Sequence, residues 1–133
     1  MKSTFTFAIR SPLPVLASGL PSKLTDSTTG NDGASGVKLY NFEQPIPIPS
    51  YLFALASGDI ASASIGPRST VWTGPDELSD SKWELEEGTE AFIKAAEKIV
   101  FPYAWETYDV LVLPGSFPYG MSIHDPPISC DRV

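Results

Sequence analysis

The first part of the chain alternates apolar and polar side chains, as β-strands do. Residues 4–9 place an apolar side chain at every second position, which predicts a strand with one apolar face: Phe5, Phe7 and Ile9. Pro12 ends this strand, because proline has no N–H for a ladder. Residues 18–36 are rich in Ser, Thr, Gly, Asp and Asn, so we expect a surface loop there.

A second block of strands is predicted before residue 58. Residues 37–42 resume the strand pattern. Residues 44–49 carry proline at every second position, which favours an extended, packed connector. Residues 51–56 are apolar almost throughout and predict a strand buried on both faces, closed by Gly58.

The pattern changes at the Gly66-Pro67 step. Only strands are predicted before it, whereas a strand at residues 70–72, a helix and a strand at residues 110–113 follow it. This change from β to β-α-β predicts a domain boundary. The run of four apolar residues at 110–113 predicts a central strand with both faces covered.

The helix is predicted to begin at Thr89, or two or three residues earlier, and to end before Pro102. Its apolar residues follow the i, i+3, i+4, i+7 spacing of a single stripe: Phe92, Ala95, Ala96 and Ile99. Glutamates near its start and lysines near its end suit the helix dipole. We interpret these charges as a solvated face rather than a metal site.

Residues 115–120 form a turn-rich stretch directly after the predicted central strand. In open α/β sheets such loops often carry ligand contacts. A plain turn with two packed aromatic side chains is the simpler interpretation of the spacing alone.

Composition and net charge narrow the classes of partner and the cellular compartment that we expect. The chain of 133 residues has a net charge of −7, which disfavours nucleic acid and anionic membrane surfaces as partners. It lacks the apolar runs of a signal peptide or a membrane span, so we expect a soluble cytoplasmic protein. A single Cys excludes an internal disulfide framework and suggests a reducing compartment.

Candidate metal and catalytic donors are few. His124 and Cys130 are the only His and Cys, so no HExxH motif exists and a Ser-His-Asp triad would have no visible scaffold. A calcium site among Asp76, Glu77 and Asp80 is disfavoured, because the spacing is not that of an EF-hand. We therefore predict no catalytic residue and no metal ligand.

Separate stretches in one order carry a family resemblance: PIPSYL at 47–52, IGPRSTVW at 65–72, PYAWETYD at 102–109 and VLVLPGSFPYG at 110–120. Together they resemble the leukotriene A-4 hydrolase branch of the HExxH zinc aminopeptidases. The resemblance implies the end of an all-β saddle domain at residues 1–66 and the start of a thermolysin-like α/β catalytic domain at residues 67–120, both incomplete. Residues 121–133 have no counterpart in that family and form an unrelated tail.

The resemblance also implies a substrate-binding segment. The family motif Gly-Gly-Met-Glu-Asn follows a proline-tyrosine pair, and its glutamate grips the α-amine of a peptide. Tyr119 and Gly120 match the opening of this segment, and Met121 matches the methionine when one glycine is skipped. Ser122 then stands where the glutamate should be, so the amine anchor is missing.

Two functions follow as expectations. The first is a fragment of a zinc aminopeptidase that removes N-terminal residues from peptides, with epoxide hydrolysis as a further family activity; this chain alone would be inactive and bind no zinc. The second is a non-catalytic β-rich interaction module. Against the module, the strand at 110–113 would need neighbours that the chain does not supply, so we expect self-association through exposed strands.

We expect the break after Gly120 to be a frame change or a retained intron that truncates the product. Sequencing the transcript across the Gly120 codon tests this, and an mRNA that faithfully encodes residues 121–133 and a stop codon would contradict a gene-prediction error.

Overall fold

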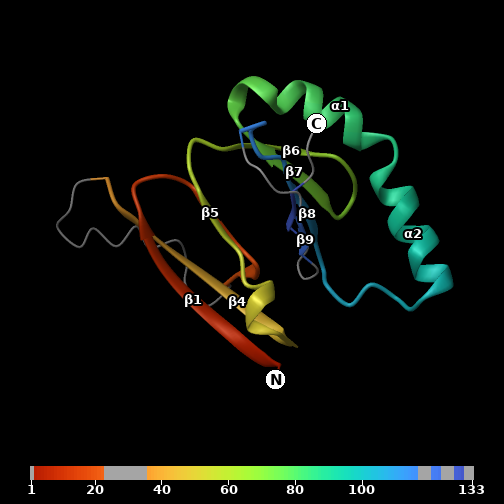
Figure 1. Cartoon of the computed structure of the whole chain (residues 1–133), viewed down its shortest axis with the longest axis horizontal. Coiled ribbons are helices and arrows are strands. Elements are labelled where there is room, and N and C mark those ends of the chain that lie inside the picture. The colour runs from red at the N-terminus through yellow and green to blue at the C-terminus, as the bar shows by residue number, and fades with distance from the viewer. Residues whose placement is uncertain (1, 23–35, 117–120, 124–127, 131–133) are drawn as a thin grey trace. The chain divides into compact units, whose positions relative to one another are not determined.

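The protein is described here by a computed structural model covering residues 2–22, 36–116, 121–123 and 128–130, the last two ranges by their backbone alone. It divides into two compact units, Met1–Asp59 and Ile60–Val133 (Figure 1). This division precedes the predicted boundary at Gly66, because the strand just before that step pairs with the strand just after it. The family's domain boundary itself stays a prediction.

The first unit is built from strands. β1 (Ser3–Ser11) pairs antiparallel with β4 (Lys38–Ile48), and β3 (Leu20–Pro21) pairs with the other edge of β4. β2 (Val15–Ala17) and β5 (Leu55–Ser57) form a separate two-stranded ribbon, and a 3₁₀ turn, η1 (Ser50–Leu52), precedes β5. The predicted strand at 4–9 is confirmed as part of β1.

The core of this unit lies where the alternating apolar faces meet. Phe42 packs with Val15 and Ala17, and half-buried side chains of β1 and β4 complete the cluster: Phe7, Ile9 and Tyr40. Since Phe7 and Phe42 are directly paired across β1 and β4, the alternation predicted from the sequence places both on the buried face.

A buried polar pair joins the two sheets of the first unit. The Ser18 hydroxyl donates toward the carbonyl oxygens of Leu52 (3.3 Å) and Ala54 (3.2 Å) and accepts from the Ala54 N–H (2.6 Å). The Gln44 amide Nε2 donates to the Ser18 carbonyl oxygen (3.3 Å). Ser18 and Gln44 are almost fully buried, so the start of the predicted surface loop belongs to the interior instead. Residues 23–35 of that loop lie outside the described residues.

The proline-rich stretch is part of β4 rather than a connector after it. Its extended conformation is as predicted, and the ladder with β1 is irregular there, between Ser3 and Phe5. The lone N–H between Pro45 and Pro47, that of Ile46, donates to Gln44 Oε1 (3.1 Å). The Gln44 side chain therefore satisfies two backbone groups: Nε2 donates to the Ser18 carbonyl oxygen, and Oε1 accepts from the Ile46 N–H.

The prediction of a strand buried on both faces at residues 51–56 is wrong. The segment begins as η1 and becomes a strand only at Leu55. Tyr51 is 77% exposed and Leu55 is 50% exposed. A run of hydrophobic residues without periodicity predicts burial but does not predict which residues are buried. Here Leu52, Ala54 and Ala56 are partly buried, whereas the residues between them are exposed.

The second unit is an α/β sheet with strand order β6-β7-β8-β10-β9. β6 (Ala61–Ser64) and β7 (Ser69–Thr73) form an antiparallel hairpin, β8 (Tyr108–Leu111) is parallel to β7 and to β10 (Ile128–Cys130), and β9 (Met121–Ile123) is antiparallel to β10. The predicted central strand is confirmed, since β8 is flanked on both sides and Val110, Leu111 and Val112 are buried. The chain therefore supplies the neighbours that we expected it to lack.

Two helices connect β7 to β8, where one was predicted. A 3₁₀ turn, η2 (Pro75–Glu77), leads into α1 (Leu78–Glu86), and α2 (Thr89–Ile99) follows after a short break. The Thr89 hydroxyl donates to the Leu85 carbonyl oxygen (2.7 Å), so Thr89 bonds back to α1 instead of capping α2. Parallel strands need such a helical crossover (Figure 1).

The core of the second unit lies between the sheet and α1. Ile65, Val71, Val110 and Val112 are almost fully buried, and half-buried apolar side chains pack against them: Ala63, Leu78, Leu85 and Tyr108. α2 contributes its one buried residue, Ile93.

The predicted apolar stripe of α2 does not pack within the described part of the chain. Phe92 is 77% exposed and Ile99 is 83% exposed, and Ala95 and Ala96 are exposed as well. Of the glutamates predicted to form a solvated face, Glu84, Glu86 and Glu87 are exposed, whereas Glu90 binds Arg68 at the start of β7. The periodicity located the stripe correctly but not the surface that covers it.

Replacing Ser18 by Ala should destabilise the protein by about 1–3 kcal/mol, because the Ala54 N–H loses its acceptor in a buried site. Urea unfolding followed by circular dichroism measures the change. The exposed Ser3→Ala variant on β1 is the control and should stay within about 0.5 kcal/mol of the parent. Equal stability of S18A and the parent would contradict this role.

Candidate functional site

A bidentate arginine cluster fixes α2 to the start of β7. Arg68 lies just before β7, and its guanidinium donates to both carboxylate oxygens of Glu97 (2.9 Å each) and of Glu90 (3.2 and 3.3 Å). Glu90 and Glu97 are seven residues apart on α2 and therefore share one helix face. The planar fork of arginine matches two carboxylates in a way that lysine cannot.

The segment that leads from α2 to β8 closes around the same cluster. The Tyr103 N–H donates to Glu97 Oε1 (3.1 Å), and its ring lies under the Arg68 guanidinium at 5.8 Å. The Tyr103 hydroxyl donates to the Thr107 carbonyl oxygen (3.1 Å), and the Tyr108 N–H donates to the Arg68 carbonyl oxygen (2.8 Å). The cluster thus sets where β8 begins relative to β7.

The charges of the cluster stabilise one another. Hydrogen bonds from the Arg68 side chain and from the Tyr103 N–H lower the pKa of Glu97 to about 2. The hydrogen bond to Glu97 raises the pKa of Arg68, so the guanidinium stays charged throughout. The cluster is therefore a fixed structural ion network over the ordinary pH range.

A second polar contact lies on the sheet itself. Trp72 Nε1 donates to Asp109 Oδ1 (3.2 Å) from β7 to β8. Burial raises the pKa of Asp109, and hydrogen bonds from Trp72, Thr107 and Thr70 oppose that shift in part. A carboxyl with this property occurs at many functional sites, but Asp109 is fully engaged by its own sheet neighbours.

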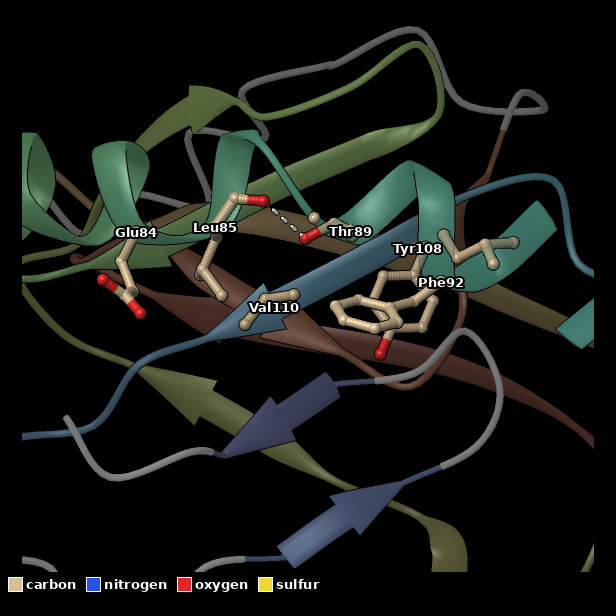
Figure 2. A pocket seen from close by; sticks show the side chains of 8 residues that line it. Glu84, Leu85, Thr89, Phe92, Tyr108 and Val110 are labelled. Atoms are coloured by element: carbon tan, nitrogen blue, oxygen red, sulfur yellow. Dashed lines mark hydrogen bonds between the residues drawn. The ribbon is translucent and has the colours of Figure 1, made fainter. Parts of the chain in front are cut away.

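A pocket of about 320 Å³ lies where α1 meets α2 above β8 (Figure 2). Figure 2 shows the rings of Phe92 and Tyr108 together at one end, with Leu85 and Val110 at the other and Glu84 at the rim. The remaining lining residues come from the break between the helices and from the buried face of α2: Gly88, Thr89 and Ile93. The lining is mainly apolar, and its geometry suits an apolar side chain or ligand rather than a reacting group.

The structure does not test the predicted substrate-binding residues. Tyr119 and Gly120 lie outside the described residues. Met121 is the first residue of β9, which is described by its backbone alone. Their assignment to substrate binding stays a prediction.

The described residues also offer no fit for the zinc that the resemblance implies. Among residues 2–22 and 36–116, no three His, Cys, Asp or Glu side chains lie close enough to hold a metal ion, the carboxylates at 76, 77 and 80 included. His124 lies outside the described residues, and Cys130 is described by its backbone alone. A catalytic zinc needs three protein ligands beside its water, so these residues do not fit one.

The comparisons with known proteins decide the relationship. No protein-family model matches the chain. Over 120 residues it is 67% identical to the leukotriene A-4 hydrolase homolog of Botryotinia fuckeliana and 65% identical to leucine aminopeptidase 2 of Sclerotinia sclerotiorum. Each match takes in 90% of this chain. The chain is a relative of the leukotriene A-4 hydrolases, as its motifs predicted.

Solved structures agree with the sequence matches. Native yeast LTA4 hydrolase superposes with a TM-score of 0.83 at 49% identity over 98% of this chain, and its complex with Bestatin with a TM-score of 0.81 at 48% identity over 97%. The chain spans about a fifth of the length of these relatives, 19–20% in the sequence matches and 19% in the structures. None of the described helices combines the length and the apolar character that a bilayer crossing demands.

The structural match extends further than the sequence matches. A superposition over 98% of the chain must include part of residues 121–133, for which the sequence pattern predicts no element. β9 and β10 form within that range. That residues 121–133 are unrelated to the family stays a prediction.

Sequence reasoning missed the arginine cluster, although a signal for it was present. Two glutamates spaced seven apart lie on one face of a predicted helix, and an arginine stands at the start of the preceding predicted strand. α1 gave a weaker signal, because its only buried residue is Ser81 and no apolar stripe marks it.

Replacing Glu97 by Gln should flatten the acid dependence of stability. The folded-state pKa of about 2 lies below the ordinary 4.5, so the parent's stabilisation is present above pH 4.5 and is lost as the pH falls toward 2. Urea midpoints of the parent between pH 6 and pH 2 should therefore fall more steeply than those of E97Q.

The exposed Glu87→Gln variant, between the two helices, is the matched control and should keep the steep acid loss of the parent. Parallel curves for E97Q and the parent would contradict the role of Glu97 in the cluster.

Proposed function

We propose that this chain is a scaffold segment of a leukotriene A-4 hydrolase-like aminopeptidase. Its sequence identity of 67% and 65% to the two fungal relatives over 120 residues is the observation that carries the proposal. In this interpretation residues 1–66 are the end of the β saddle, residues 67–120 begin the catalytic domain, and residues 121–133 are an unrelated tail. The compact first unit and the α/β second unit support this order of domains.

The segment's own contribution is geometric. β8 is held between β7 and β10, and its carboxyl end leads into the stretch at 115–120. Ligand contacts in open α/β sheets gather at such strand ends. Tyr119, Gly120 and Met121 would there line the groove for a peptide, and the cluster around Arg68 would hold the strand that leads to them.

The activity of the whole enzyme is the removal of N-terminal residues from peptides, with hydrolysis of an epoxide as a second activity. A yeast relative solved in complex with Bestatin supports a peptide-like ligand. Zinc would supply the Lewis acid of that chemistry. The described residues of this chain do not provide the ligands that zinc needs. In this proposal the zinc ligands come from other parts of the enzyme, and this chain by itself is inactive. We place the protein in the cytoplasm, with no nucleic-acid or membrane partner.

A non-catalytic module is the second candidate, and one observation favours it. The first unit has a sheet, a ribbon and an apolar cluster of its own, and its buried Ser18 and Gln44 satisfy their polar groups internally. Such a unit could persist alone as a partner-binding piece. A protease-resistant product of about this unit in limited proteolysis would favour the module over the scaffold segment.

The purified chain should bind much less than one equivalent of zinc and release no naphthylamine from leucyl-naphthylamide. Metal analysis after dialysis and a fluorescence assay measure the two, with the intact Botryotinia homolog as the positive control. Zinc near one equivalent together with activity that a chelator removes would overturn the inactive-segment proposal.

A further inference from the structure

Asp109 is a partly buried acid to which the proposed chemistry gives no task. It stands on β8, and its pairing partners are Thr70 of β7 and Ile128 of β10. Val71 and Val110 lie in the core with residues of α1, so alternation along the strands places Asp109 on the opposite face of the sheet. Valine or threonine suits such a strand position, whereas a carboxylate there costs desolvation free energy unless it is paired.

Hydrogen bonds reach the Asp109 carboxylate from two elements. Trp72 Nε1 donates to Oδ1 from β7 (3.2 Å), and the side chains of Thr70, also on β7, and of Thr107, directly before β8, donate to the same group. An ionised carboxylate only accepts hydrogen bonds, so it can receive all three at once. The carboxylate therefore ties the Trp72 indole to β8 in one orientation.

Trp72 carries this constraint to the far end of β8. The strand ends at Leu111, and the N–H of the next residue, Val112, donates to the Trp72 carbonyl oxygen (2.9 Å). Trp72 thus holds β8 at two points, Asp109 through its indole and Val112 through its backbone. Because Trp72 is the last residue but one of β7, few ladder bonds hold its backbone beyond these contacts. A released indole would loosen the bond to Val112.

We propose that Asp109 is a positioning residue for peptide binding, which acts through Trp72 to fix Val112, the point where the chain leaves β8. The inference rests on the proposed function, in which the stretch that follows Val112 leads to the substrate-binding residues. Asp109 itself touches no substrate in this proposal. Its effect is to hold the exit of β8 in the place from which that stretch extends.

Three variants separate this role from packing. Asp109→Leu is close to aspartate in size but has no acceptor, so the indole N–H and the two threonine hydroxyls lose their partner. Asp109→Asn keeps an oxygen for the indole and is the matched control. Trp72→Phe removes the indole donor and keeps the backbone carbonyl that binds Val112, so it decides the question if D109L does not fold.

Amide hydrogen exchange, measured by NMR on this chain, tests the link from Asp109 to Val112. The Val112 N–H should exchange at least about tenfold faster in D109L and W72F than in D109N, because its acceptor is no longer held in place. The Ile65 N–H, which donates to the Ser69 carbonyl oxygen, is the internal reference. Its exchange rate should stay within about twofold in all variants.

Steady-state kinetics test the link from Val112 to peptide binding. The variants are placed in a full-length chimera, in which residues 1–120 replace the matched segment of the Botryotinia homolog. D109L and W72F should raise KM for leucyl-naphthylamide at least about fivefold, whereas D109N should stay within about twofold of the parent chimera. A merely structural role would lower kcat through loss of folded enzyme and leave KM unchanged, because the remaining molecules bind substrate normally.

Two results would each overturn the inference. One is a Val112 exchange rate in the folded variants equal to that of D109N, and the other is an unchanged KM. A folded parent chimera without aminopeptidase activity counts against the proposed function, and Val112 exchange then decides alone whether Asp109 fixes the end of β8. An active parent chimera whose KM does not respond counts against the role of Asp109 alone.

Discussion

The orientation of one helix depends on one guanidinium. Arg68 stands at the entry to β7 and binds two carboxylates that lie two helical turns apart on α2, and Tyr103 closes over the same group. Bidentate pairs of this kind add direction to attraction, because the guanidinium donates its hydrogen bonds to carboxylates within its own plane. The cluster therefore determines which face of α2 meets the sheet and which remains outside. It also places the start of β8 through the Arg68 carbonyl oxygen.

The first unit depends on a different constraint, the satisfaction of buried backbone groups. β4 contains prolines that cannot donate, and the ribbon of β2 and β5 is too short to pair every group nearby. Ser18 and Gln44 supply the missing partners from their side chains. Burying these polar groups is affordable only because each is paired, which is why a Ser-rich stretch begins inside the protein and not on its surface.

The sequence predicted those parts of the fold in which one local pattern matches one neighbour. The strand at the N-terminus and the central strand at 110–113 followed from period-2 alternation and from an apolar run. The segment at 51–56 was predicted wrongly, because its apolar residues have no period that assigns them a face. α1 was missed, since its buried residue is Ser81 and its hydrophobic side chains are few. For α2 the stripe was found, but its direction depends on a contact with an arginine more than twenty residues away in sequence.

The exposed stripe of α2 shows why local sequence patterns could not predict the candidate site, which followed only from the family resemblance. Periodicity says which side of a helix is apolar, but the covering layer is a property of the whole polypeptide, and this chain spans about a fifth of its relatives. The same holds for the chemistry, because no group of side chains in the described part of the chain could hold a metal ion, whereas β8 has a neighbouring strand on both sides. A segment can thus fold its own sheet while one face of a helix, with Phe92 and Ile99, stays exposed in the described part of the chain. What Arg68 contributes is position: its carbonyl oxygen binds the start of β8, and its guanidinium binds α2.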